Sequence, residues 1–126
     1  MRAQASAEFI FMIMTGTAMI LIFTVIFSEL YQDNLTDKKN IIMQDFGYSI
    51  QNEFLIASQT LPGYTRTFDV PEKLEGFTYE ATIIGNVLLI NYTINTFAFP
   101  IPPVSGELKK GANVLVNENN SLCLNC

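Results

Sequence analysis

An uninterrupted run of nineteen uncharged residues, FIFMIMTGTAMILIFTVIF from Phe9 to Phe27, constrains this chain more than any other feature. As an α-helix the run would be about 28 Å long, which is enough to cross the hydrocarbon core of a bilayer. A chain of 126 residues is too small to bury such a helix on every side. We therefore predict a helix that is surrounded either by lipid or by copies of itself.

The same helix is predicted to continue well beyond the uncharged run. No proline occurs before Pro62, and the glycines before that point are Gly16 and Gly47. Past the run, apolar residues recur at helical spacings among acidic residues, which is typical of an amphipathic helix; they are Tyr31, Leu35, Ile42, Phe46, Ile50 and Phe54. We predict one helix from about Gln4 to about Ser58, roughly 80 Å long. Residues 4–30 form its apolar half, and residues 31–60 form an amphipathic half that can pack on a small domain.

Turn residues and alternating segments predict a small β domain over residues 61–126. The helical pattern ends at Leu61-Pro62-Gly63. The segments YTRTFDV (64–70), FTYEATII (77–84) and VLLINYTI (87–94) are predicted strands, and Gly85-Asn86 predicts a tight hairpin turn between the last two. The strand over 87–94 is apolar on both faces. We expect the rear half of the helix to cover one face and neighbouring subunits to cover the other.

Prolines and a second turn shape the rest of this domain. The segment FAFPIPPV (97–104) cannot be a central strand, because its three prolines lack amide donors. We interpret it as an extended connector pressed on the core, the alternative being a polyproline ligand. Another hairpin is predicted, with Leu108 before the turn Lys109-Lys110-Gly111 and residues 114–116 after it. The predicted fold class is therefore α+β, with one long N-terminal helix packed at its end by a small antiparallel sheet of three to five strands.

Composition argues against several classes of function. Twelve acidic residues against seven basic ones disfavour a nucleic-acid partner, which would need clustered lysine and arginine. The sequence has no histidine, the usual general base near neutral pH and a common metal ligand. It also lacks G-x-S-x-G, a phosphate-binding glycine loop and H-E-x-x-H. We predict that the protein is not an enzyme and has no catalytic residues, cofactor or metal.

The residues ahead of the uncharged run distinguish two kinds of membrane segment. A secretory signal peptide would have a shorter apolar region and a small-residue cleavage site, and the end of this run, FTVIFSELYQ, offers no A-x-A pattern. A plain signal-anchor accounts for the hydrophobicity but not for QASAE, the stretch from Gln4 to Glu8.

The residues Gln4, Ser6 and Glu8 resemble the Q-x-S-x-E core of the class III signal peptide of archaeal type IV pilin-like proteins. The resemblance implies that a prepilin peptidase cuts between Ala3 and Gln4, removes residues 1–3 as a leader and leaves the apolar helix on the mature chain. A long unbroken helix followed by a small β domain is also similar to that family. The sequence departs from the family pattern in its short leader, in Ala3 where glycine is usual and in Met12 where leucine is usual.

If the chain is processed as this resemblance implies, we expect Glu8 to take part in subunit assembly. A carboxylate at bilayer depth is unfavourable by several kcal/mol unless it is paired. Cleavage would create a positive amine at Gln4, which could meet Glu8 of the same or a neighbouring subunit. The alternative is that Glu8 simply interacts favourably with the dipole at a helix N-terminus.

Aromatic residues on the helix are predicted to contribute to subunit packing. Phe23, Phe27 and Tyr31 are spaced four apart and share one helical face, and Phe9 and Phe11 lie just after Glu8. An electron-carrying ladder is one interpretation of the first three. Ordinary aromatic packing between helices is the interpretation we adopt.

Cys123 and Cys126 form the motif C-L-N-C. We order their interpretations as a structural disulfide first, free thiols second, and metal or redox chemistry third, because zinc needs about four ligands and no histidine is available. Three glycosylation sequons begin at Asn34, Asn91 and Asn119. Asn91 shares a strand face with Val87 and Leu89, and we predict that it points outward and can carry a glycan.

These features together predict a pilin, which is the structural subunit of an archaeal type IV pilus-like filament used for adhesion or surface attachment. Its expected partners are copies of itself, a prepilin peptidase, an assembly ATPase and a membrane platform protein. We expect it in the cell membrane as a precursor and then in an extracellular surface filament. The alternatives are a minor pilin or archaellum-related protein and, from another class, a monomeric membrane-anchored extracellular binding module.

Overall fold

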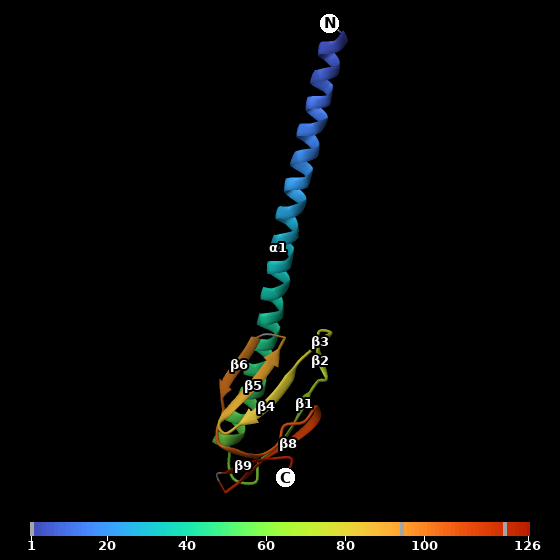
Figure 1. The fold of residues 1–126 in the computed structure, drawn as a ribbon. Coiled ribbons are helices and arrows are strands. Elements are labelled where there is room, and N and C mark those ends of the chain that lie inside the picture. The colour runs from blue at the N-terminus through green and yellow to red at the C-terminus, as the bar shows by residue number, and fades with distance from the viewer. Residues whose placement is uncertain (1, 94, 120) are drawn as a thin grey trace. The chain divides into compact units, whose positions relative to one another are not determined.

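The computed structural model describes residues 2–93, 95–119 and 121–126. In this part of the chain one helix, α1 (Arg2–Gln59), is followed by nine strands (Figure 1). The predicted α+β class is confirmed, and the predicted helix from about Gln4 to about Ser58 agrees with α1 to within two residues at each end. The chain divides into two compact units, of which the first ends at Lys39 and the second runs from Asn40 to Cys126.

The strands form three sheets in the second unit. The larger sheet has the order β1-β8-β9-β7, made of β1 (Thr65–Val70), β8 (Gly111–Glu118), β9 (Ser121–Leu124) and β7 (Val104–Gly106). A three-stranded sheet contains β4 (Glu80–Ile84), β5 (Val87–Tyr92) and β6 (Asn95–Pro100), and a two-stranded sheet contains β2 (Lys73–Leu74) and β3 (Phe77–Thr78). The pairings are antiparallel except that of β7 with β9, which is parallel.

The rear part of α1 supplies one side of the hydrophobic core. Its buried positions recur at spacings of three and four, as the helical period requires, and they are Met43, Gly47, Ile50, Phe54 and Ala57. They pack against residues of the strands, of the link between β3 and β4 and of the segment after β6, namely Val70, Tyr79, Leu88, Ile90, Phe99, Ile101, Leu115, Leu122 and Leu124. The predicted stripe was correct at Ile50 and Phe54, with Phe46 partly buried. It was wrong at Tyr31, which is 64% exposed.

Three predictions about strands are wrong. The connector predicted over 97–104 is strand β6 as far as Pro100; β6 lies at the edge of its sheet, where a missing amide donor is tolerated. The hairpin predicted around Lys109-Lys110-Gly111 does not form. Gly111 instead begins β8, whose partner β1 lies about forty residues earlier in the chain, with Val70 opposite Gly111. The number of strands also exceeds the three to five predicted, because short pairs such as β2 and β3 form as well.

The hairpin predicted at Gly85-Asn86 is confirmed. Ile84 pairs with Val87, and Gly85 has a φ of 61°, a left-handed conformation that glycine adopts without strain. β5 ends at Tyr92, whereas the predicted strand ended at Ile94, which lies outside the described residues. Leu88 and Ile90 on β5 are fully buried. The opposite face of β5 is half-buried and carries Asn91.

A buried asparagine on β8 caps the end of α1. The side-chain amide of Asn117 donates hydrogen bonds to the carbonyl oxygens of Ala57 (2.9 Å) and Thr60 (3.1 Å). Carbonyls in the last turn of a helix have no partner within it, so this side chain replaces the missing donors. The backbone of Asn117 also accepts from the amide of Gly63 (2.7 Å) and donates to the carbonyl of Tyr64 (2.9 Å). The turn after the helix is thereby fixed on the sheet.

Candidate assembly surface and modification sites

The apolar half of α1 exposes its large side chains along its length in the first unit. The exposed fractions of Phe9 and Phe11 are 65% and 73%, and those of Phe23 and Phe27 are 57% and 65%. By length and composition α1 is apolar enough to cross a membrane: an 18-residue window has a mean hydropathy of 2.4, and none of that window is buried. Exposed apolar area of this extent is typical of a lipid-facing or protein-facing surface.

The processing motif lies in the first turns of α1. Gln4, Ser6 and Glu8 are all helical and exposed. Gln4 and Glu8 are four residues apart, so they lie on the same side of the helix, with Cβ atoms about 5–6 Å apart. Ser6 is two residues from each and does not share that side. The backbone of Ala3 is helical as well, whereas Met1 of the predicted leader lies outside the described residues.

The aromatic residues on α1 form one stacked pair. The ring centroids of Phe23 and Phe27 are 6.3 Å apart, with an angle of 30° between the ring planes. Tyr31 is exposed one turn further along, and it has no ring contact among the described residues. Among the described residues, the three aromatic side chains therefore form a single pair and not a continuous ladder.

The three sequons lie in three different local structures. Asn34 is within α1, and its side-chain amide donates to the carbonyl of Leu30 at 2.8 Å. Asn119 is exposed between β8 and β9 and has a φ of 49°, which asparagine tolerates better than most residues. Asn91 is the fifth residue of β5. It lies on the strand face opposite to the buried Leu88 and Ile90.

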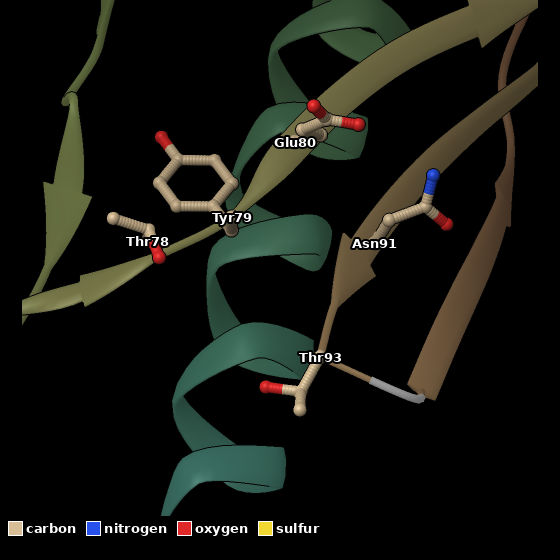
Figure 2. A pocket seen from close by; sticks show the side chains of 5 residues that line it. All are labelled: Thr78, Tyr79, Glu80, Asn91 and Thr93. Carbon is tan, nitrogen blue, oxygen red and sulfur yellow. The ribbon is translucent and has the colours of Figure 1, made fainter.

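Asn91 borders a polar groove that the sequence did not reveal. The groove encloses about 370 Å³ and is lined by Thr78, Tyr79, Glu80, Asn91 and Thr93. Figure 2 shows Glu80 and Asn91 on neighbouring strands, and the two residues are direct cross-strand partners. Predicting the groove would have required the register between β4 and β5, which depends on the length of the hairpin as well as on the residues themselves.

Tyr79 is a buried residue that lines this groove. Its hydroxyl donates to the carbonyl of Pro71, and the amine of Lys110 lies 3.1 Å from its ring centroid while donating to its carbonyl oxygen at 3.0 Å. Burial, with the negative charge of Asp69 second, raises the pKa of Tyr79 to about 12. Burial also lowers the pKa of the Lys110 amine, against the opposing charges of Glu72 and Glu80. This cation–π contact holds the segment before β8 against Tyr79, the residue that links β3 to β4.

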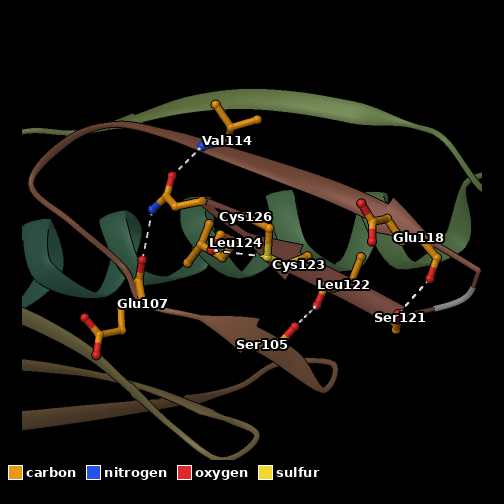
Figure 3. The surroundings of a disulfide bond; sticks show 10 residues. Ser105, Glu107, Val114, Glu118, Ser121, Leu122, Cys123, Leu124 and Cys126 are labelled. Atoms are coloured by element: carbon orange, nitrogen blue, oxygen red, sulfur yellow. Dashed lines mark hydrogen bonds between the residues drawn. A yellow bond between two sulfur atoms is a disulfide. The ribbon is translucent and has the colours of Figure 1, made fainter.

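Cys123 and Cys126 form a disulfide, with Cα atoms 5.8 Å apart (Figure 3). Asn125, which lies between the two cysteines directly after the end of β9, is bonded to several segments of the larger sheet. Its backbone amide donates to the carbonyl of Val114 (2.7 Å), and its side-chain oxygen accepts from the amide of Val114 (2.9 Å). Its side-chain amide donates to the carbonyl of Glu107 (2.9 Å) and to Oδ1 of Asn113 (2.8 Å). The disulfide therefore closes a loop around a residue that joins β8 to the end of β7.

Neither a protein-family model nor a curated protein nor a solved structure matches this chain. Within the described ranges, no group of three or more potential metal-ligating side chains is present.

Proposed function

We propose that this chain is the structural subunit of a type IV pilus-like surface filament, in which the apolar halves of many α1 helices bundle together. The observation that carries the proposal is the division within α1 itself. Its rear part is buried by the β domain, whereas its apolar front part exposes every large side chain. Such a front part has to be covered by lipid or by other helices, and a filament core provides copies of the same helix.

The Gln4–Glu8 pair supports polymerisation over simple anchoring. Cleavage before Gln4 would place a positive amine one helical turn from Glu8, on the same side of the helix. In an apolar bundle that amine and the carboxylate of the same or a neighbouring subunit can neutralise each other. A buried carboxylate without a partner would be strongly unfavourable, so the pairing would favour assembled subunits over separated ones.

The resemblance at Gln4, Ser6 and Glu8 supplies the proposed partners. A prepilin peptidase would process the precursor in the membrane, and an assembly ATPase with a membrane platform protein would drive polymerisation. The length and apolar composition of α1 support a membrane stage for the precursor. The β domain would then face outward on the filament and serve adhesion or surface attachment, either as a major or as a minor subunit.

Sequencing the N-terminus of the protein from sheared cell-surface material tests this proposal. A mature chain that begins at Gln4, recovered in filaments visible by electron microscopy, is the expected result. A chain that keeps Met1 and stays in the membrane fraction as single copies would instead identify a membrane-anchored binding module.

A further inference from the structure

We propose that Asn91 is the acceptor of an asparagine-linked glycan, and that the first sugar of this glycan lies in the groove beside Glu80 and Thr78. Asn91-Tyr92-Thr93 is a sequon, and it lies where β5 ends. The inference rests on the proposed function in one respect, because oligosaccharide transfer to asparagine takes place outside the cytoplasm and requires the β domain to be exported.

The position of Asn91 leaves its side chain available for modification. Residues alternate between the two faces of a strand, and the neighbouring Ile90 is fully buried against the core. Asn91 therefore faces away from α1, into the groove. Its side-chain amide forms no hydrogen bond with the described residues. A glycan on Nδ2 would displace no contact that stabilises the sheet.

The surroundings of Asn91 are suited to a sugar. Glu80 on β4 and Thr96 on β6 are its direct cross-strand partners, so their side chains flank it at about 5 Å between Cβ atoms. Thr78 and Thr93 also border the groove (Figure 2). A carboxylate and several hydroxyls can accept and donate hydrogen bonds to the hydroxyl groups of a pyranose ring. The groove of about 370 Å³ lies within the size range of small-molecule sites.

The other two sequons lack this arrangement. Asn34 lies within a continuous helix, where its amide is already bonded to the carbonyl of Leu30. In the third sequon the hydroxyl of Ser121 donates to the carbonyl of Glu118 at 2.7 Å, across the turn that holds Asn119. By contrast, the chain leaves the strand at Thr93, which has a φ of 50° and is exposed. Asn91 combines a free amide, an exposed sequon threonine and polar neighbours.

The transfer step needs a lipid-phosphate-linked oligosaccharide as co-reactant and an oligosaccharyltransferase as catalyst. The Nδ2 atom of Asn91 attacks C1 of the first sugar, forming the C–N bond while the C–O bond to the lipid phosphate breaks. The lipid phosphate leaves with the electron pair of that bond, and Nδ2 loses one proton. No oxidant or reductant takes part.

Peptide mass spectrometry of the native protein tests the acceptor. Trypsin cleaves after Lys73 and Lys109 and releases residues 74–109, in which Asn91 heads the one sequon, and cleavage after Lys110 releases residues 111–126, which carry Asn119. The expected result is an oligosaccharide mass on the 74–109 peptide. A bare 74–109 peptide, or a glycan found on the 111–126 peptide alone, overturns the inference.

Matched variants at Thr93 separate modification from folding. Thr93→Val keeps the shape of the side chain and all of Asn91 but removes the sequon hydroxyl, so the glycan mass should disappear. Thr93→Ser restores a sequon and should restore the glycan. A glycan that persists in Thr93→Val would overturn the assignment to this sequon.

Hydrogen exchange tests whether the first sugar lies in the groove. Backbone amides of residues 78–80 should exchange several-fold more slowly in the glycosylated protein than in Thr93→Val, and Glu80→Ala in the glycosylated protein should reverse that difference. Equal exchange rates in the two proteins would overturn the placement of the first sugar in the groove.

The failure of this inference can be told apart from the failure of the proposed function. Filaments built from subunits with bare Asn91 would overturn this inference and leave the proposed function standing. A glycosylated chain that never polymerises would overturn the proposed function and leave this inference standing.

Discussion

The ring of Phe99 occupies the space that a Cβ atom at Gly47 would fill. This close approach joins β6 to α1, and the ring also meets Tyr48 edge-on, with centroids 5.1 Å apart. One turn further along the helix, the side-chain amide of Gln51 donates to the carbonyl of Pro100 at 2.6 Å. The missing side chain at Gly47 therefore lets the strand rest directly on the helix backbone.

Gly47→Ala should lower the free energy of unfolding of the β domain. Alanine is favoured over glycine in a helix by about 1 kcal/mol, but overpacking a tight core usually costs about 1–3 kcal/mol. Phe99 is 5% exposed and has little room to move, so we expect the cost of overpacking to exceed the gain in helix propensity. A lower urea midpoint in mild detergent is the expected measurement, with the exposed Ser49→Ala as control. An unchanged or higher midpoint would show that the ring can move aside.

Alkaline pH should destabilise the domain through Tyr79. The folded state keeps the phenol protonated up to about pH 12, whereas the unfolded chain loses that proton near its ordinary pKa of 10.0. The unfolded state therefore binds fewer protons in this window, and stability falls as the pH rises from 10 to 12, by roughly 1–3 kcal/mol. Tyr79→Phe should be less stable at neutral pH because it loses the bond to Pro71, but its stability should fall less over that window. Parallel pH slopes for the two proteins would contradict this assignment.

Cys123 and Cys126 should remain oxidised in assembled protein. Maleimide labelling of intact filaments without reductant is expected to modify neither residue, and labelling after reduction to modify both. Replacing both with serine should cost about 2 kcal/mol of stability, since so short a loop restrains the unfolded chain only modestly. Complete labelling before reduction would refute the prediction.

Glu8→Gln should separate insertion from assembly. Glutamine has nearly the same size as glutamate and no charge, so the variant should still insert and still be cleaved before Gln4. It should nevertheless polymerise poorly, because removing one partner of a buried ion pair typically costs about 3–5 kcal/mol. Electron microscopy of sheared filaments measures the result, and Ser28→Ala, further along the helix, is a suitable control. Normal filaments from Glu8→Gln cells would exclude the pairing mechanism.

Periodicity made the long helix and the hairpin at Gly85 predictable, because both are specified by residues close together in the sequence. The remaining features depend on partners that lie far apart. Asn117 caps a helix that ends about sixty residues earlier, and Gly47 is required only because Phe99 lies above it. The motif at Gln4 and Glu8 and the sequon at Asn91 are visible in the sequence. The groove beside Asn91 is not, because it needs the register that places Glu80 opposite it.

The position of β9 between β8 and β7 determines when the larger sheet can be completed during synthesis. β9 is the last strand in chain order, yet it has neighbours on both sides, so the larger sheet stays incomplete until Leu124 has left the ribosome. At about 5–20 residues per second, Leu124 follows Phe27 by roughly 5–20 s. In the proposed pilus subunit, the apolar half of α1 would reach the membrane within that interval. Delivery of the helix would then precede completion of the domain, and each precursor would fold its outer part while already tethered.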